Sequence, residues 1–227
     1  PADFIPACEG IPASDPATLQ CYFEAYVRLH VLEPIGMTSS GYLLPESEWS
    51  NCAPCENDTS YLHRVIQGQV SDGNAYALGG IAGHAGVFST ALDVFPFLYK
   101  WMYPEPSDPV LNSTTAAYFI TEYNHTQSSR ALGWNTNDPY AYDEGWDLSC
   151  GNMSARTFLH TGYTGTEMCG DPVNEIFTIL LTNRVYPTAD NNQMHQVRQN
   201  FNNAVLEALG LWPPASDKDS EEILTVT

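Results

Sequence analysis

Basic side chains are scarce in this sequence. Only 8 of its 227 residues are Lys or Arg, against 27 that are Asp or Glu, and the formal net charge is −19. Binding to nucleic acid or to an anionic membrane surface depends on clustered positive charge, so we expect neither partner. The only lysines are Lys100 and Lys218, which restricts any mechanism that needs a lysine base.

Long apolar runs are also missing. No stretch of about 18 consecutive apolar residues occurs, which predicts that there is no transmembrane segment. Hydrophobic residues nevertheless make up 43% of the chain. That share is enough to form a core, so global disorder is excluded. The length suits one large domain or two small ones.

Cysteines and glycosylation sequons indicate an oxidising compartment. The six cysteines allow up to three disulfides, and the sequence leaves their connectivity open. Cys52 and Cys55 form a lone C-x-x-C, whereas a zinc ribbon needs a second pair, so we expect no metal and no cofactor. The N-x-S/T sequons, which are candidate glycosylation sites, are Asn57, Asn112, Asn124 and Asn152. Together with the acidic surface they predict a secreted, extracellular or lumenal glycoprotein.

Periodicity and turn residues divide the chain into three regions. These are a proline-rich, irregular segment at 1–17, an ordered domain at 18–212 and a polar tail at 213–227. The patterns predict helices over 18–31, 90–102, 114–122 and 190–209, and strands over 156–163, 167–171 and 176–182. The last strand is apolar and β-branched, which predicts burial on both faces. A strand meander closed by a helix predicts an α+β fold, with an antiparallel sheet flanked by helices.

The segment from His160 to Thr166 reads His-Thr-Gly-Tyr-Thr-Gly-Thr. A strand that runs into a glycine-containing turn presents backbone N–H groups at its edge, where they stabilise an oxyanion. His160 and Thr161 are candidates to bind a substrate carboxylate or carbonyl oxygen. An ordinary tight turn, in which the glycines supply positive φ, explains the same residues and is favoured on pattern alone.

A second glycine-rich segment precedes the helix predicted over 90–102. Small residues between Gly79 and Thr90 allow a ligand or a neighbouring segment to approach the backbone closely. The spacing matches neither a dinucleotide-binding loop nor a phosphate loop with its lysine. A lone histidine such as His84 is more often a hydrogen-bonded structural residue than a catalyst.

Several segments occur together in a distinctive order. They are Val31–Met37 (VLEPIGM), Gln69–Ala75 (QVSDGNA), Gly79–Thr90 (GGIAGHAGVFST), Leu132–Trp134 (LGW), His160–Thr166 (HTGYTGT) and Leu180–Pro187 (LLTNRVYP). This order resembles serine β-lactamase-related proteins, which include class C β-lactamases, penicillin-binding DD-peptidases and related esterases. The resemblance covers about residues 22–209, with insertions at about 43–75 and 104–150. It implies a β-lactamase/transpeptidase-like fold.

The resemblance also implies an acyl-enzyme mechanism. In the family, the serine of an S-x-x-K motif attacks a carbonyl, while its lysine and the tyrosine of a Y-x-N motif transfer protons. The third motif of the family lines the opposite wall of the cleft. Carried over to this sequence, the catalytic positions are His160, Thr161, Gly162 and Tyr163, the last through its backbone N–H in the oxyanion hole. The substrate-binding positions are Gly83, His84 and Thr164.

The first two motifs of the family are absent from this sequence. Phe97 and Ala215 stand three residues before the two lysines, and none of the 13 tyrosines has Asn two residues later. In the family both motifs precede the segment that starts here at Val31, so the chain resembles a C-terminal half. It starts at Pro1 without an initiator Met, and we expect it to be proteolytically processed. The nucleophile is then expected on the N-terminal half of the same precursor or on another β-lactamase-like chain.

Two functions remain open. One is the C-terminal chain of a serine hydrolase of the DD-peptidase or esterase type, active as a hetero-oligomer once the nucleophile is supplied. The other is a catalytically inactive structural or binding subunit of a larger extracellular or lumenal assembly. The intact His160-Thr161-Gly162 motif favours the first, whereas the sequons and the acidic surface favour the second.

Overall fold

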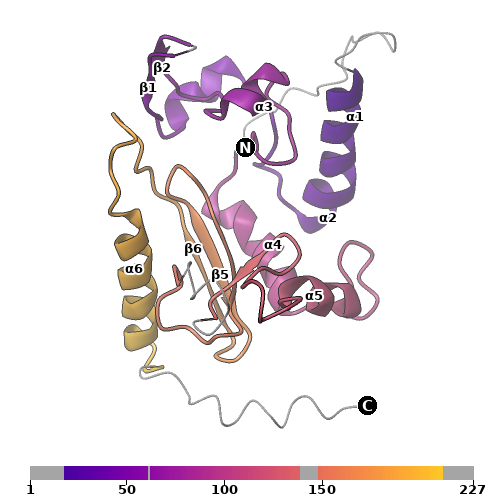
Figure 1. The fold of residues 1–227 in the computed structure, drawn as a ribbon. Helices are drawn as coiled ribbons and strands as arrows, with labels where there is room; N and C mark the ends of the chain where they lie inside the picture. Colours follow the sequence, from indigo (N-terminus) through magenta and orange to yellow (C-terminus); the bar gives the residue numbers. More distant parts are fainter. Residues whose placement is uncertain (1–17, 61, 139–147, 212–227) are drawn as a thin grey trace. The chain divides into compact units, whose positions relative to one another are not determined.

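Figure 1 shows the computed structural model of the chain, which describes residues 18–60, 62–138 and 148–211. The chain divides into two compact units. The first contains residues 1–97 and 183–191, and the second contains residues 98–182 and 192–227. The segment predicted to be irregular at the N-terminus and the polar C-terminal tail lie outside the described residues. The single ordered domain over 18–212 stays a prediction.

The first unit begins with a helix that changes its winding. α1 (Thr18–Val27) continues directly into the π-helical turn η1 (Arg28–Leu32) and the short helix α2 (Glu33–Ile35). The helix was predicted to run to about Val31, but the helical run continues four residues further, to Ile35. Pro34 lies inside this continuous run, directly after the π-helical turn, where the winding departs from that of a regular α-helix. The helix ends at Gly36, whose φ of 88° suits glycine.

The rest of the first unit consists of short elements around a small core. They are the 3-10 helix η2 (Glu46–Asn51), an antiparallel pair of β1 (Asn57–Asp58) and β2 (Arg64–Val65), and the helix α3 (Gly73–Ala77). Cys21, Tyr42 and Ile81 form the buried cluster of this unit, with Val27 and Leu43 packed against it. Helix α1 thus contributes to the core through residues on one face only.

Helix α4 (Ala91–Met102) starts in the first unit and ends in the second. Its start is fixed by Thr90, whose hydroxyl accepts a hydrogen bond from the Asp93 backbone N–H at 3.2 Å. The buried Asp93 carboxylate accepts hydrogen bonds from the Ser39 backbone N–H at 2.6 Å and from the Ser40 hydroxyl at 2.7 Å. These bonds attach the loop that follows α2 to the first turn of α4.

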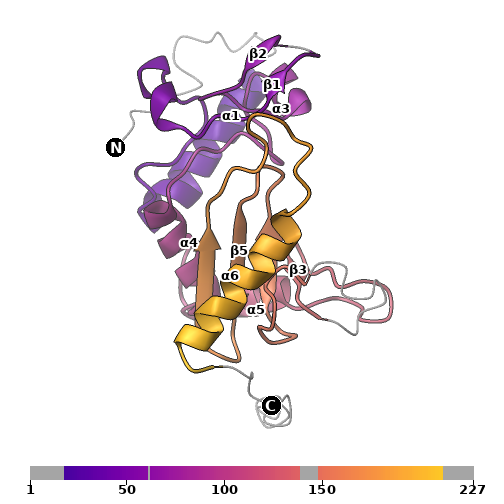
Figure 2. The same cartoon turned by 90° about the vertical axis from the view of Figure 1, so that its left-hand side faces the viewer.

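The second unit is built on an antiparallel sheet. Its strands are β3 (Asn135–Thr136), β4 (Phe158–Thr161), β5 (Glu167–Asp171) and β6 (Ile176–Leu180), which neighbour one another in chain order. Helix α6 (Met194–Ala208) lies across one face of this sheet (Figure 2). Leu206 of α6 packs there against Leu159 and Cys169 of the strands. Helix α5 (Ser113–Ile120) starts at Asn112, whose side chain caps it. The predicted α+β fold is confirmed.

The burial predicted for β6 was wrong. The apolar run was expected to be buried on both faces, but of the five residues of β6 only Thr178 is buried. In the part of the chain that the structure describes, β6 pairs with β5 alone and therefore lies at an edge of the sheet. An edge strand leaves backbone N–H and C=O groups without a strand partner. The composition of β6 is thus that of an inner strand, while its position is at an edge.

Candidate active site

The His-Thr-Gly segment lies where β4 turns into β5. His160 and Thr161 end β4 and pair with Met168 and Glu167 of β5. His160 is exposed, and Tyr163 is 62% exposed. Because directly opposed residues of an antiparallel pair share a face, Thr161 lies on the same face as Glu167, and His160 lies on the other.

The turn after β4 is closed by backbone hydrogen bonds and held from outside by two side chains. The Gly162 N–H donates to the Thr166 carbonyl at 2.8 Å. The Arg198 guanidinium of α6 donates to the carbonyls of Gly162, at 2.9 Å, and of Thr166, at 3.0 Å. The Thr182 hydroxyl donates to the Gly165 carbonyl at 2.7 Å. Charge-assisted bonds of this kind are among the stronger ones in proteins, so Arg198 makes the turn a fixed feature of the unit.

The two glycines of this turn are needed for different reasons. A Cβ at Gly162 would stand 2.1 Å from Thr166 Oγ1, so any larger residue displaces Thr166. Gly165 has φ of 112°, a conformation that side-chain-bearing residues rarely adopt. The structure therefore supports the tight-turn interpretation at the level of backbone geometry. The same turn places the His160 and Tyr163 side chains at the surface.

Aromatic rings pack beside His160 on its own face of the sheet, the face away from Thr161 and Glu167. The Trp134 ring lies edge-to-face against His160, with centroids 6.4 Å apart, and against Phe158, with centroids 5.0 Å apart. Trp101 of α4 packs on Trp134 at 5.4 Å. Trp134 and Phe158 are both buried, so they form a rigid base for the His160 ring. Sequence reasoning used Trp134 only as part of the family resemblance, because its partners are distant in the sequence.

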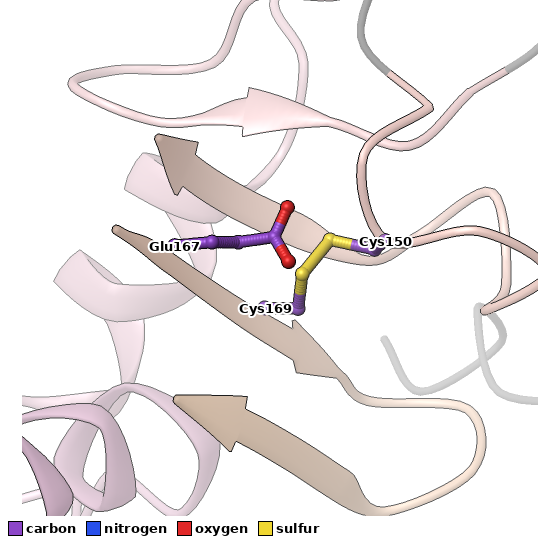
Figure 3. A group of neighbouring side chains, drawn as sticks. All are labelled: Cys150, Glu167 and Cys169. Carbon is purple, nitrogen blue, oxygen red and sulfur yellow. A yellow bond between two sulfur atoms is a disulfide. The ribbon is translucent and has the colours of Figure 1, made fainter. Parts of the chain in front are cut away.

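A buried polar network lies on the α6 face of β5. Asn202 of α6 donates to Glu167 Oε2 at 2.8 Å and accepts from the Thr178 hydroxyl at 2.7 Å. Glu167 also lies beside a disulfide between Cys150 and Cys169 (Figure 3). Because the two sulfur atoms are bonded to each other, they offer no thiolate to a metal ion. The network ties α6 to the strand that follows the His-Thr-Gly turn.

The remaining cysteines decide how many disulfides the chain can form, which the sequence left open. Cys21 is also disulfide-bonded, but Cys52 and Cys55 are free thiols, so three disulfides within the chain do not form. Burial raises the pKa of the Cys52 thiol and that of the Cys55 thiol. A raised thiol pKa lowers the thiolate fraction near neutral pH, and with it the reactivity of both residues.

Gly83 and His84 belong to the first unit, whereas His160, Thr161 and Thr164 belong to the second. His84 Nε2 lies 3.0 Å from Asp72 Oδ1. Asp72 caps α3 by accepting a hydrogen bond from the Ala75 N–H at 2.8 Å. This bond and the His84 contact lower the pKa of the Asp72 carboxyl. The contact with Asp72 is that of a hydrogen-bonded structural histidine, which is the role more often expected of a lone histidine such as His84.

The sequon residues differ in their surroundings. Asn57 in β1 and Asn152 are exposed. Asn112 and Asn124 are partly buried, and their side-chain oxygens accept hydrogen bonds from the backbone N–H groups of Thr115 and Thr126. Glycosylation stays a prediction at all four positions. No helix in the described ranges is long and apolar enough to span a bilayer.

An antiparallel sheet with a helix across one face and a fixed His-Thr-Gly turn defines an α+β protein with the arrangement expected of the β-lactamase-related family. Comparison with known proteins agrees with this assignment. The family model described as Beta-lactamase matches residues 20–202, and the chain belongs to that family.

Two curated relatives are similar in sequence to part of this chain. A protein of Escherichia coli K12 named "Putative D-alanyl-D-alanine carboxypeptidase" is 28% identical over 183 residues, which are 74% of this chain and 41% of that protein. A protein of the same name from Salmonella agona is 30% identical over 134 residues, which are 58% of this chain and 30% of that protein. The chain therefore spans about two fifths of the length of the E. coli relative.

Solved structures show the same fold at low sequence identity. A β-lactamase from Mycobacterium bovis superposes with a TM-score of 0.53 at 17% identity, covering 82% of this chain and 56% of that one. A mutant of simvastatin synthase (LovD) from Aspergillus terreus gives 0.57 at 14% identity, covering 82% and 51%. A penicillin-binding protein homologue from Caulobacter crescentus gives 0.50 at 15% identity, covering 78% and 52%.

Proposed function

We propose that this chain is the C-terminal part of a serine hydrolase of the DD-peptidase or esterase type, which works through an acyl-enzyme. The observation that carries the proposal is the turn after β4. Arg198 and Thr182 hold it by hydrogen bonds to its carbonyls, and His160 lies exposed beside it on buried aromatic rings. Such rigidity suits a wall that must hold a substrate carbonyl in place.

Each residue of the motif has a distinct role in this proposal. His160 and Thr161 anchor the acyl substrate through its carboxylate or carbonyl oxygen. The Tyr163 backbone N–H is one donor of the oxyanion hole, and removal of such a donor costs about 3–4 kcal/mol of activation free energy. Gly162 allows the close approach of Thr166 that sets the direction of the turn. Thr164, Gly83 and His84 contribute to substrate binding.

In this proposal the catalytic nucleophile comes from residues outside this chain. The sequence contains neither S-x-x-K nor Y-x-N, and the chain covers 41% of its E. coli relative. We place the missing motifs on the N-terminal half of the same precursor or on another β-lactamase-like chain. The edge strand β6 supports this, because its apolar residues are only partly covered and its outer backbone groups suit a further strand.

A second candidate is a catalytically inactive structural or binding subunit of an extracellular or lumenal glycoprotein assembly. Two observations favour it: the exposed side chains of two sequons, Asn57 and Asn152, and the absence of a nucleophile motif from the sequence. The Cys150–Cys169 disulfide suits an oxidising compartment under either candidate.

Covalent labelling of the purified assembly separates the two candidates. A fluorophosphonate or a penicillin probe should modify a serine on the partner segment, and His160→Ala should reduce the labelling rate. His195→Ala is a matched control, because His195 is an exposed histidine of α6 outside the motif. The hydrolase is rejected if no serine is labelled and the partner lacks S-x-x-K. Equal labelling of the His160→Ala and His195→Ala variants would exclude the assigned role of His160.

A further inference from the structure

A histidine and two carboxylates converge in the second unit, in residues that the proposed hydrolase does not use. Glu122 and His125 follow α5 and are three residues apart, and Asp138 follows β3. His125 Nδ1 lies 3.0 Å from Glu122 Oε1 and 2.7 Å from Asp138 Oδ2. One possible ligand atom from each of the three residues lies within 4.8 Å of the other two.

Hydrogen bonding leaves the oxygens of this cluster short of donors. One oxygen of Glu122 and one of Asp138 approach the same ring nitrogen of His125, and that nitrogen carries at most one proton. The second carboxylate oxygen of Glu122, Oε2, is buried and has no hydrogen-bond partner among the described residues. A buried acceptor without a donor costs about 1–3 kcal/mol. A cation held between the three groups would compensate both the charge repulsion and this cost.

The cluster borders a small pocket of about 200 Å³. Glu122 and Asp138 form part of its wall, together with Thr136 and Arg156. A metal ion held by three protein ligands beside an open pocket has room for a fourth ligand from solvent, as in zinc sites that keep an open position. Arg156 supplies a positive charge to the same pocket, which suits an anionic fourth ligand.

We propose that Glu122, His125 and Asp138 bind one zinc ion, with an open coordination position that faces this pocket. One imidazole nitrogen and two carboxylate oxygens are ordinary zinc ligands, and the two carboxylates balance the charge of the ion. Tetrahedral bonds of about 2.0–2.1 Å separate two ligand atoms by about 3.3 Å. The contacts of His125 Nδ1 must therefore widen by a few tenths of an ångström, which its half-exposed side chain can follow.

The proposal departs from the expectation of no metal, which was based on the C-x-x-C alone. The signal in the sequence is the Glu-x-x-His spacing of Glu122 and His125. It is incomplete without Asp138, which is 13 residues after His125. Asp138 reaches the other two residues because the Thr136 N–H and hydroxyl both donate to the Ser129 carbonyl, which folds the segment after α5 back onto β3.

Isothermal titration calorimetry of the full chain with zinc chloride tests the proposal. Cys52 and Cys55 are first alkylated, so that their thiols cannot bind the metal. One zinc ion should bind per chain, and His125→Ala and Glu122→Gln should each weaken binding by about tenfold or more. His195→Ala is the matched control and should bind as the parent does.

Thermal unfolding provides a second measurement that does not depend on activity. Zinc should raise the unfolding temperature of the parent chain and of His195→Ala, because the ion binds the folded state. Zinc should have little effect on the unfolding temperatures of His125→Ala and Glu122→Gln. Circular dichroism spectra of both variants serve to check that they fold. Absence of zinc binding by the parent chain, or binding that survives both substitutions, would overturn the proposal.

Discussion

Gly170 of β5 should not tolerate a single added methyl group. It lies directly opposite Phe158 of β4, and the fully buried Phe158 ring covers it. A Cβ at position 170 would stand 2.3 Å from Phe158 Cζ, with two further ring carbons at 2.7 and 2.9 Å. Non-bonded carbon atoms normally stay about 3.5 Å apart or more. The ring must therefore move by roughly 1 Å, or the two strands must separate.

The Phe158 ring has little room for such a movement, since Trp134 packs against it with centroids 5.0 Å apart. Overpacking of a core costs about 1–3 kcal/mol, and removal of a buried phenylalanine side chain costs about 3–5 kcal/mol. We expect Gly170→Ala to lower the free energy of unfolding by about 2–4 kcal/mol. In urea titrations followed by tryptophan fluorescence, an m value of about 2 kcal/mol/M makes this a midpoint shift of about 1–2 M.

Gly73→Ala is the matched control for this substitution. Gly73 is the first residue of α3, and an added Cβ there meets no heavy atom within 4 Å. Alanine at this position should be neutral or stabilising by up to about 1 kcal/mol. Phe158→Leu removes the ring carbons that block the new methyl group, so Gly170→Ala should cost at least about 1 kcal/mol less in that background. Equal costs in the two backgrounds, or a Gly170→Ala variant as stable as Gly73→Ala, would refute the steric argument.

Three further predictions concern the turn, an ion pair and the thiols. Arg198→Met removes the donor of two hydrogen bonds to the turn after β4. It should cost about 1.5–3 kcal/mol and speed amide exchange there, and Arg198→Lys should restore part of the loss. Lys100 lowers the pKa of the Asp108 carboxyl to about 2, so an NMR titration should show that midpoint, and Lys100→Met should raise it. The stabilisation from this pair is present above the ordinary carboxyl pKa and is lost as the pH falls toward about 2. Peptide mapping without reductant should find Cys52 and Cys55 alkylated by iodoacetamide, slowly in the folded chain because burial raises both thiol pKa values.

Each of these predictions has an outcome that contradicts it. Amide exchange in the turn that is the same in Arg198→Met and the parent would show that the guanidinium does not hold it. An Asp108 titration that is unchanged by Lys100→Met would assign the low pKa to the neighbouring backbone N–H groups alone. Recovery of Cys52 and Cys55 as a linked peptide pair would show that the two thiols form a disulfide.

Local pattern in the sequence was sufficient for the family, the fold class and most secondary structure. β5 lies over 167–171 as predicted, and α4 (Ala91–Met102) nearly coincides with the helix predicted over 90–102. Both results follow from properties of neighbouring residues, namely alternation, turn residues and a side chain that caps the first turn. The order of the motifs is equally a property of the chain read in one dimension. For this reason the absence of S-x-x-K and Y-x-N was also certain from the sequence.

The tertiary structure alone decided which distant side chains meet. It showed that Arg198 of α6 holds a turn more than 30 residues earlier and that Cys150 pairs with Cys169 while Cys52 and Cys55 stay reduced. It also put the apolar strand β6 at an edge of the sheet. Periodicity reports which face of an element is apolar, but it does not report what covers that face. Contacts between segments depend on strand order and on helix placement, which are set by the packing of the whole unit.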